Sequence, residues 1–209
     1  VIICAASEAN LTEETEVLEA RKPSLSIGNY WEYSIDYFYS GMTGTITREI
    51  IGESNVIIGT QSYECFKIKI LQFVQLDTSE WSMIMNLYLL KSDLSVVKED
   101  YQLEQNGVIK QIANITYSPP FKELDFPITV GKNWAAVTTK TETIEIPPQS
   151  PSTSTVQFSR NFSVVRTEKV QVSAGTFDTF VIGYETSENI YEEYYSSTVG
   201  GNVMELVYD

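Results

Sequence analysis

The feature that most constrains the fold of this chain is an alternation of apolar and polar residues with a period of two. In WEYSIDYFY, at residues 31–39, aromatic or aliphatic side chains at every second position alternate largely with acidic or hydroxyl side chains. Successive side chains of a β-strand point to opposite faces, so this stretch predicts an amphipathic strand. The same pattern returns in FKIKI at residues 66–70 and in later segments, and turn residues such as Asn106-Gly107 separate them.

Together these segments predict about a dozen short strands and no clear helix beyond the N-terminal stretch. The 13 Tyr and 9 Phe residues agree with this, because aromatic side chains favour the half-buried surface of a sheet. We therefore expect an all-β protein, in which residues 25–209 form a single domain built on a strongly curved antiparallel sheet or half-barrel. Two packed sheets remain the alternative.

An internal repeat is predicted by a Gly-x-x-Trp element that occurs twice. Gly28 and Trp31 are matched by Gly131 and Trp134, about half a chain later. Further matched pairs are Ile50 with Val164, Gly59-Thr60 with Gly175-Thr176, Phe66 with Phe180, Tyr88 with Tyr195 and Val96 with Val203. The pairs predict two copies of one β-unit, residues 25–105 and 106–209. The second copy would carry a Pro/Ser/Thr-rich loop insertion at 147–155.

The N-terminal residues 1–24 differ in character from the rest. VIICAASEA resembles the end of a secretory leader followed by small residues, and the acidic stretch after it resembles a tether. Cys4 as a lipid-attachment site and a simple buried N-terminus are the alternatives. We expect an extracytoplasmic protein, secreted or anchored at the cell surface, with a possible N-terminal membrane tether and no transmembrane span. We also expect Cys4 and Cys65 not to be bonded to each other.

Charge and composition exclude several classes of function. The net charge of −14 makes nucleic acid a poor partner, since no basic cluster offsets it. The chain contains no histidine, which removes Ser-His-Asp and Cys-His catalysis and the commonest metal ligand. Acidic pairs such as Glu192-Glu193 and Glu123 with Asp125 are expected on solvated faces. We predict no catalytic residues, no metal site, no cofactor and no enzymatic activity.

A resemblance to known proteins is carried by short motifs. Val-x-x-Gly-Thr-Phe-Asp-Thr, from Val172 to Thr179, is preceded by Gly-x-x-Trp and followed by a Tyr-Tyr-Ser strand. This pattern resembles a loose group of uncharacterised extracytoplasmic β-sheet proteins of bacteria and archaea. These are in turn remotely similar to the half-barrel fold of bacterial lipoprotein carriers. The resemblance covers residues 25–209 and implies no catalytic residue.

The aromatic strand at 31–39 is the sequence feature that points to function. Its rings either form a core layer or line a concavity that holds a ligand. We predict that a ligand contacts Tyr33, Tyr37 or Tyr39, because the second copy lacks these rings behind Trp134. The expected partner is a small apolar ligand or an envelope protein, bound without catalysis on the curved sheet. A carbohydrate-binding or adhesion surface of exposed aromatic residues is the alternative.

Overall fold

The computed structural model describes residues 2–6, 19–36, 42–76 and 78–208, and shows β-strands without a helix in this part of the chain. This confirms the predicted all-β, antiparallel class. The strands are β1 (Ile2–Ala6), β2 (Tyr30–Asp36), β3 (Thr43–Ile58), β4 (Gln61–Leu76), β5 (Ser79–Leu90), β6 (Val96–Gln105), β7 (Val108–Phe121), β8 (Asn133–Glu145), β9 (Ser152–Val172), β10 (Gly175–Glu185), β11 (Ile190–Ser196) and β12 (Gly201–Tyr208).

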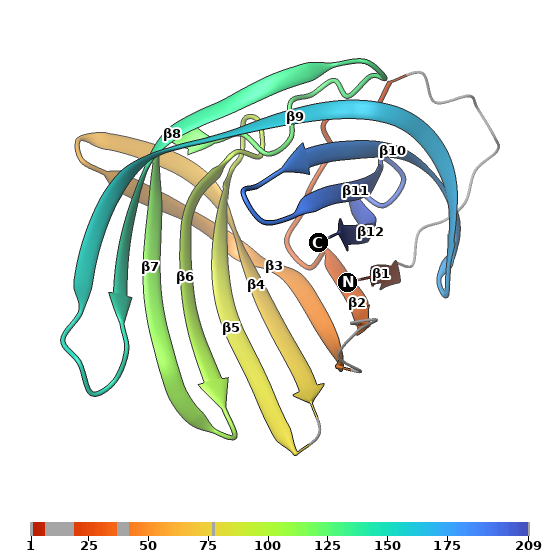
Figure 1. Ribbon diagram of the computed structural model, residues 1–209. Coiled ribbons are helices and arrows are strands. Elements are labelled where there is room, and N and C mark those ends of the chain that lie inside the picture. The colour runs from red at the N-terminus through yellow and green to blue at the C-terminus, as the bar shows by residue number, and fades with distance from the viewer. Residues whose placement is uncertain (1, 7–18, 37–41, 77, 209) are drawn as a thin grey trace.

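The strands from β2 to β12 follow one another in chain order across one antiparallel sheet. The short β1 pairs with β12 on one side and with β2 on the other, and so lies between the two ends of that sheet. In Figure 1 the long strands β4 to β7 run side by side, and β9 arches over the top of the molecule. The N and C marks lie close together, beside β1 and β12. The sheet is therefore strongly curved, with an inner and an outer face.

The alternation predicted from the sequence holds in β2. Trp31, Tyr33 and Ile35 are buried, while Glu32 and Ser34 between them are exposed. The predicted Asn106-Gly107 turn joins β6 to β7, and both of its residues have positive φ angles, 50° and 74°. Two successive positive φ angles suit the twist of a tight hairpin, which is why the Asn-Gly pair occurs there.

The two Gly-x-x-Trp elements form turns with the same hydrogen bonds. The Gly28 N–H donates to the Ile50 carbonyl, and the Gly131 N–H donates to the Val164 carbonyl, at 2.9 and 2.8 Å. Both glycines have φ angles near 90°, at 90° and 84°, where other residues are strained. After each turn comes a strand that carries the tryptophan, β2 or β8.

A β-bulge follows each of these contacts at a matching place. In the β3–β4 ladder the register skips Ile51, between Ile50 and Gly52. In the β9–β10 ladder it skips Val165, between Val164 and Arg166. An extra residue in one strand bends it and increases its twist, so these bulges help to curve the sheet. The matching turns and bulges support the predicted repeat, which stays a prediction.

Two of the sequence matches within that repeat are shifted along the chain. Gly59-Thr60 forms the β3–β4 turn, but Gly175-Thr176 lies in β10, and the corresponding turn is Ser173-Ala174. In the β5–β6 ladder the bulged residue is Val97, whereas in the β11–β12 ladder it is Val203. By position in the two bulges, Val203 is therefore equivalent to Val97 and not to Val96. Alternating strands tolerate such slips in a sequence match, because neighbouring positions have similar chemistry.

The predicted insertion at 147–155 is shorter as a loop than expected. Residues from Ser152 onward already belong to β9 and pair with β8. Hydroxyl contacts join the strands there, from Thr141 to Thr155 at 3.1 Å and from Thr143 to Thr153 at 2.9 Å. Threonine is β-branched and fits a pleated sheet, so the segment lengthens the β8–β9 hairpin instead of looping out.

The N-terminal boundary also differs from the expectation. The sheet includes Ile2–Ala6 as β1, and the fully buried Ala20 forms a β-bridge with Ile128. Parts of the predicted leader or tether at 1–24 thus belong to the fold. Cys65 is a free, buried thiol, so it is not bonded to Cys4, as predicted.

Candidate functional site

The inner face of the sheet can be traced through directly opposed residues, because cross-strand partners point to the same side. One row runs from Tyr33 through Ile46, Gln72 and Met83 to Leu103. Its members on β2 and β3, Tyr33 and Ile46, are buried, whereas Met83 and Leu103 on β5 and β6 are only half-buried. The inner face is thus a packed core near β2 and β3 and an accessible apolar surface near β5 and β6.

A cavity of about 120 Å³ lies on this inner face. Aromatic and polar groups meet in it: Trp31 and Tyr33 from β2, Arg48 from β3, Glu193 from β11, and Glu123 from the connection after β7. The remaining lining is mostly aliphatic, with Leu25, Ile68, Leu87, Leu89, Leu94 and Leu124, completed by Gly200, Gly201 and Asn202. An apolar enclosure with a few convergent polar groups is the usual form of a small-molecule site.

Arg48 is brought into the cavity by its register in β3. It is opposed to Trp31 and lies two residues from the buried Ile46 and Ile50, so its side chain faces inward. The guanidinium carbon lies 5.3 Å from the centre of the Tyr33 ring. The Nε atom is buried, and no hydrogen bond or ion pair joins the guanidinium to any residue that the structure describes. Trp31 is fixed beside it, because its indole N–H donates to the Val199 carbonyl at 3.1 Å.

The carboxyl groups of the interior resist ionisation. Burial, followed by repulsion from Glu193 and Glu99, raises the pKa of Glu123 to about 8. The Glu123 residue as a whole is exposed to solvent, although its carboxyl lines the cavity. Burial likewise raises the pKa of Glu193, although an amide hydrogen bond from Asn202 at 2.9 Å opposes the rise. Burial and the charge of Glu193 raise the pKa of Glu205 on β12 to about 7.

A second inward arginine, Arg160 of β9, lies among aromatic rings. Its guanidinium carbon is 4.4 Å from the centre of the Tyr184 ring and between 5.5 and 5.8 Å from the rings of Phe158, Phe121 and Phe162. Among the described residues no carboxylate forms an ion pair with it. Cation–π contacts hold such a group in place without neutralising its charge. The field of Arg160 acts on Glu123, Glu193 and Glu205 and favours their ionised forms.

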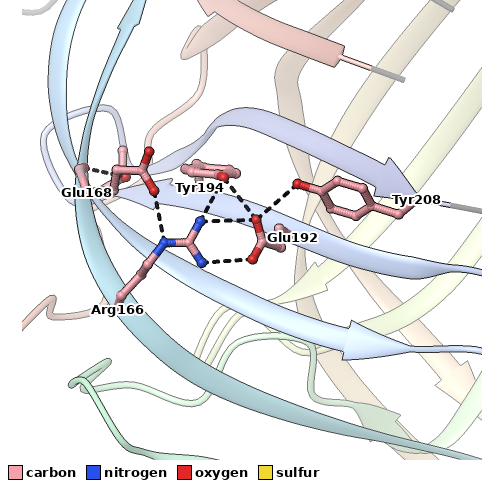
Figure 2. A network of polar contacts seen from close by, with 6 residues as sticks. Arg166, Glu168, Glu192, Tyr194 and Tyr208 are labelled. Atoms are coloured by element: carbon pink, nitrogen blue, oxygen red, sulfur yellow. Dashed lines mark hydrogen bonds and ion pairs between the residues drawn. The ribbon is translucent and has the colours of Figure 1, made fainter. Parts of the chain in front are cut away.

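A third arginine, Arg166, lies on the face of β9 to β11 opposite to that of Glu193. It belongs to the network of Figure 2, which we call the outer network, although its Tyr194 is buried in the same core cluster as Trp31 and Tyr33. Arg166 donates to both carboxylate oxygens of Glu192, at 2.8 and 3.1 Å, and to Glu168 at 2.9 Å. Tyr194 and Tyr208 donate to the same Glu192 carboxylate. Hydrogen bonds from Arg166 chiefly lower the pKa of Glu192. This network joins β9, β11 and β12 and fully engages its charged groups, so we assign it a structural role.

A larger hollow of about 670 Å³ lies across β8 to β11. It is lined by four aromatic residues, Trp134, Phe162, Tyr184 and Tyr191, and by polar residues such as Asn133, Asn161 and Glu192. It is more open than the interior cavity, and its rings already stack on one another, with the Tyr184 and Tyr191 centroids 4.6 Å apart. We prefer the smaller cavity as the candidate site, because the buried Nε of Arg48 lacks a partner there.

Of the predicted ligand-contacting tyrosines, only Tyr33 can be placed. It is 4% exposed and lines the cavity. Tyr37 and Tyr39 lie outside the described residues. Sequence reasoning missed Arg48, Glu123 and Glu193. Arg48 lies two residues from both Ile46 and Ile50, and residues two apart on a strand point to the same face. This spacing could have placed Arg48 on the inner face.

The pair Glu192-Glu193 was expected on a solvated face. The two side chains point to opposite sides of β11, as neighbours on a strand do. Glu192 joins the outer network, while Glu193 faces the interior, where burial raises its pKa. The expectation is therefore wrong for Glu193, because alternate positions of this strand, Glu193 and Tyr195, face the same side as the buried Ile182 and Phe180.

Comparisons with protein-family models, with curated proteins and with solved structures find no match. Within the described ranges no group of histidine, cysteine, aspartate and glutamate side chains is arranged to hold a metal ion. The same part of the chain contains no helix long and apolar enough to cross a membrane.

Proposed function

We propose that this protein is a non-enzymatic binding protein of the cell envelope or the extracellular space. It holds a small, largely apolar ligand within the curve of its sheet. The observation that carries the proposal is an inner face that is apolar but only half-buried along β5. Leu87 lines the cavity, and Met85, Met83 and Trp81 continue from it at every second position.

The size and shape of the interior support this proposal. The cavity takes the polar end of a ligand beside Arg48, and the β5 side chains offer a path for an apolar body. Methionine side chains are flexible and polarisable and adapt to ligands of different shape. Burial of apolar area contributes about 25 cal/mol per Å², so even a short hydrocarbon body adds useful affinity.

Two features of the proposal rest on the sequence. The extracytoplasmic location is inferred from the leader-like VIICAASEA, and detection of the protein in the extracellular or envelope fraction of its host tests it. The alternative of a sugar-binding surface requires exposed aromatic rings, and Trp31 and Tyr33 are buried at 8% and 4% exposure. Their burial favours an apolar ligand held inside over a sugar stacked on the surface.

Binding of a fluorescent apolar probe such as anilinonaphthalene sulfonate tests the proposal. Met83→Gln and Met85→Gln introduce amides of similar length on the inner face, and we expect each to weaken binding about three- to tenfold. Ile84→Gln is the matched control, because Ile84 lies on the same strand, points outward and is 43% exposed. Equal affinity of all three variants, or no saturable binding by the folded protein, contradicts the proposal.

A further inference from the structure

The strongest clue to the chemistry of the ligand is the contrast between Arg48 and Arg166. In the outer network, Arg166 has two carboxylates and a tyrosine hydroxyl as partners. In the cavity, Arg48 has the Tyr33 ring and no acceptor among the described residues, and its Nε is out of reach of water. A buried charged donor without an acceptor is costly, and a folded protein usually provides one.

The carboxyl groups beside Arg48 do not supply that acceptor. Glu123 and Glu193 line the same cavity, yet neither forms an ion pair with the guanidinium in the part of the chain that the structure describes. Glu193 is engaged by the Asn202 amide at 2.9 Å. Burial raises the pKa of both groups, so each holds a negative charge less readily than an exposed carboxyl does.

We propose that the cavity binds the carboxylate head of an amphipathic monocarboxylate, with Arg48 as the residue that recognises it. The planar guanidinium offers parallel N–H groups that match the two oxygens of a carboxylate. The hydrocarbon body then lies along Leu87, Met85 and Met83 of β5. This inference rests on the proposed function and names the class of its ligand.

The composition of the cavity favours a single negative charge over other head groups. A cavity of about 120 Å³ suits a compact head, and a doubly charged phosphate would meet Glu123 and Glu193 at close range. An alkylammonium head would be repelled by Arg48 and would leave its Nε without a partner. A neutral hydroxyl head can accept only one of the hydrogen bonds that a carboxylate accepts from a guanidinium.

The charged groups around the head also predict how binding varies with pH. Those that face the interior include Arg48 on β3, Glu99 on β6, Glu123 after β7, Lys140 and Glu142 on β8, Arg160 on β9, Glu193 on β11 and Glu205 on β12. The Tyr33 hydroxyl, whose pKa burial raises further, stays neutral. Glu99, Glu123, Glu193 and Glu205, whose pKa values burial raises, gain protons as the pH falls. A carboxylate ligand therefore binds more tightly at pH 6 than at pH 8, as long as the ligand itself stays ionised.

The test compares three ligands with the same hydrocarbon chain: decanoate, decanol and decylammonium. Calorimetry gives their affinities for the wild-type protein, for Arg48→Gln and for Arg48→Lys, and the NMR signal of carboxyl-labelled decanoate reports contact with the head. Arg166→Gln is the control, since Arg166 belongs to the outer network. Thermal unfolding confirms that each variant folds.

The expected result is a preference for decanoate that Arg48→Gln reduces by about tenfold to a hundredfold, with decanol unaffected. Arg48→Lys keeps part of the affinity for decanoate, because lysine has the same charge but cannot donate two parallel hydrogen bonds. Arg166→Gln binds decanoate like the wild type. Decanoate and decanol binding equally to the wild type and to Arg48→Gln would overturn the carboxylate head and leave the apolar site standing. Tighter binding of decylammonium would also overturn it. Absence of binding by all three ligands would sink the proposed function as well.

Discussion

Glu205 on β12 and Glu193 on β11 are directly opposed across neighbouring strands, and both extend into the same interior. On its other side Glu193 is opposed to Ile182 on β10, which is fully buried. Burial raises the pKa of both carboxyls, and the charge of Glu193 raises that of Glu205 further. The folded protein therefore binds protons at these sites more tightly than the unfolded chain does.

Replacement of Glu205 by Gln is expected to stabilise the protein at high pH. A raised pKa in the folded state means that stability is fully present below the unfolded pKa, near 4.5, and is lost as the pH rises through about 7. Glu205→Gln removes that loss. Chemical denaturation at pH 5 and pH 8 should show the variant gaining about 1 to 2 kcal/mol on the wild type between the two pH values, after allowance for partial exposure. A constant difference across this range would show that the Glu205 carboxyl is not strained by burial.

Sequence reasoning reached some of these residues and not others. Tyr33 could be predicted to face inward, because it alternates with Glu32 and Ser34 in a regular strand. Arg48 follows the same rule, but a charged residue among isoleucines is more often read as solvent-facing. Glu123 could not be placed at all, because it lies in an irregular connection where no periodicity fixes the direction of a side chain.

At the scale of elements, the turns before β2 and β8 predict paired effects of mutation. Gly28→Ala and Gly131→Ala each force a Cβ onto a backbone with φ near 90°, although nothing within 4 Å obstructs it. Each substitution should destabilise the protein by about 1 to 2 kcal/mol through backbone strain alone. Thermal or urea unfolding measures the effect.

Gly52→Ala is the matched control for this pair. Gly52 also has open space around it, but it lies in β3 without a positive φ. We expect it to be neutral or slightly stabilising, because alanine restricts the unfolded chain more than glycine does. If only one of the two turn glycines proved sensitive, the equivalence of the turns, and with it the predicted repeat, would lose its main support.

The outer network in Figure 2 predicts a second effect at this scale, because it ties three strands together. Glu192→Gln removes the charge that Arg166 binds in bidentate fashion, and we expect a loss of about 1 kcal/mol at pH 7 and low salt. The Arg166 hydrogen bonds lower the pKa of Glu192, so the wild-type advantage is present above pH 4.5 and is lost as the pH falls through the folded pKa.

Asp178→Asn serves as the comparison for that substitution. Asp178 contributes to an exposed ion pair at 3.6 Å on β10, and its removal should change stability by only a few tenths of a kcal/mol. A similar loss from both variants would mean that the Glu192 network adds nothing beyond an ordinary surface pair.

At the scale of the whole molecule, the class of fold followed from local pattern and the curvature did not. Alternation and turn residues located most strands, and the Asn106-Gly107 hairpin could be predicted with its turn type. The length of β9 was underestimated, because serine and threonine next to prolines favoured a loop, and only pairing with β8 makes them a strand. The inclusion of β1 could not be foreseen either, since its partners lie at Glu32–Asp36 and at the far end of the chain.

The chain-order arrangement of β2 to β12 has a consequence for the speed of folding. Each of these strands is hydrogen-bonded to the strand before or after it, so their pairing needs no crossover connection. Hairpins close shorter loops than crossed β topologies do, which reduces the loop entropy lost before strands pair. The β1–β12 ladder is the exception, since it unites the two extremes of the polypeptide. We therefore expect this ladder to form late, after the hairpins have brought those extremes together.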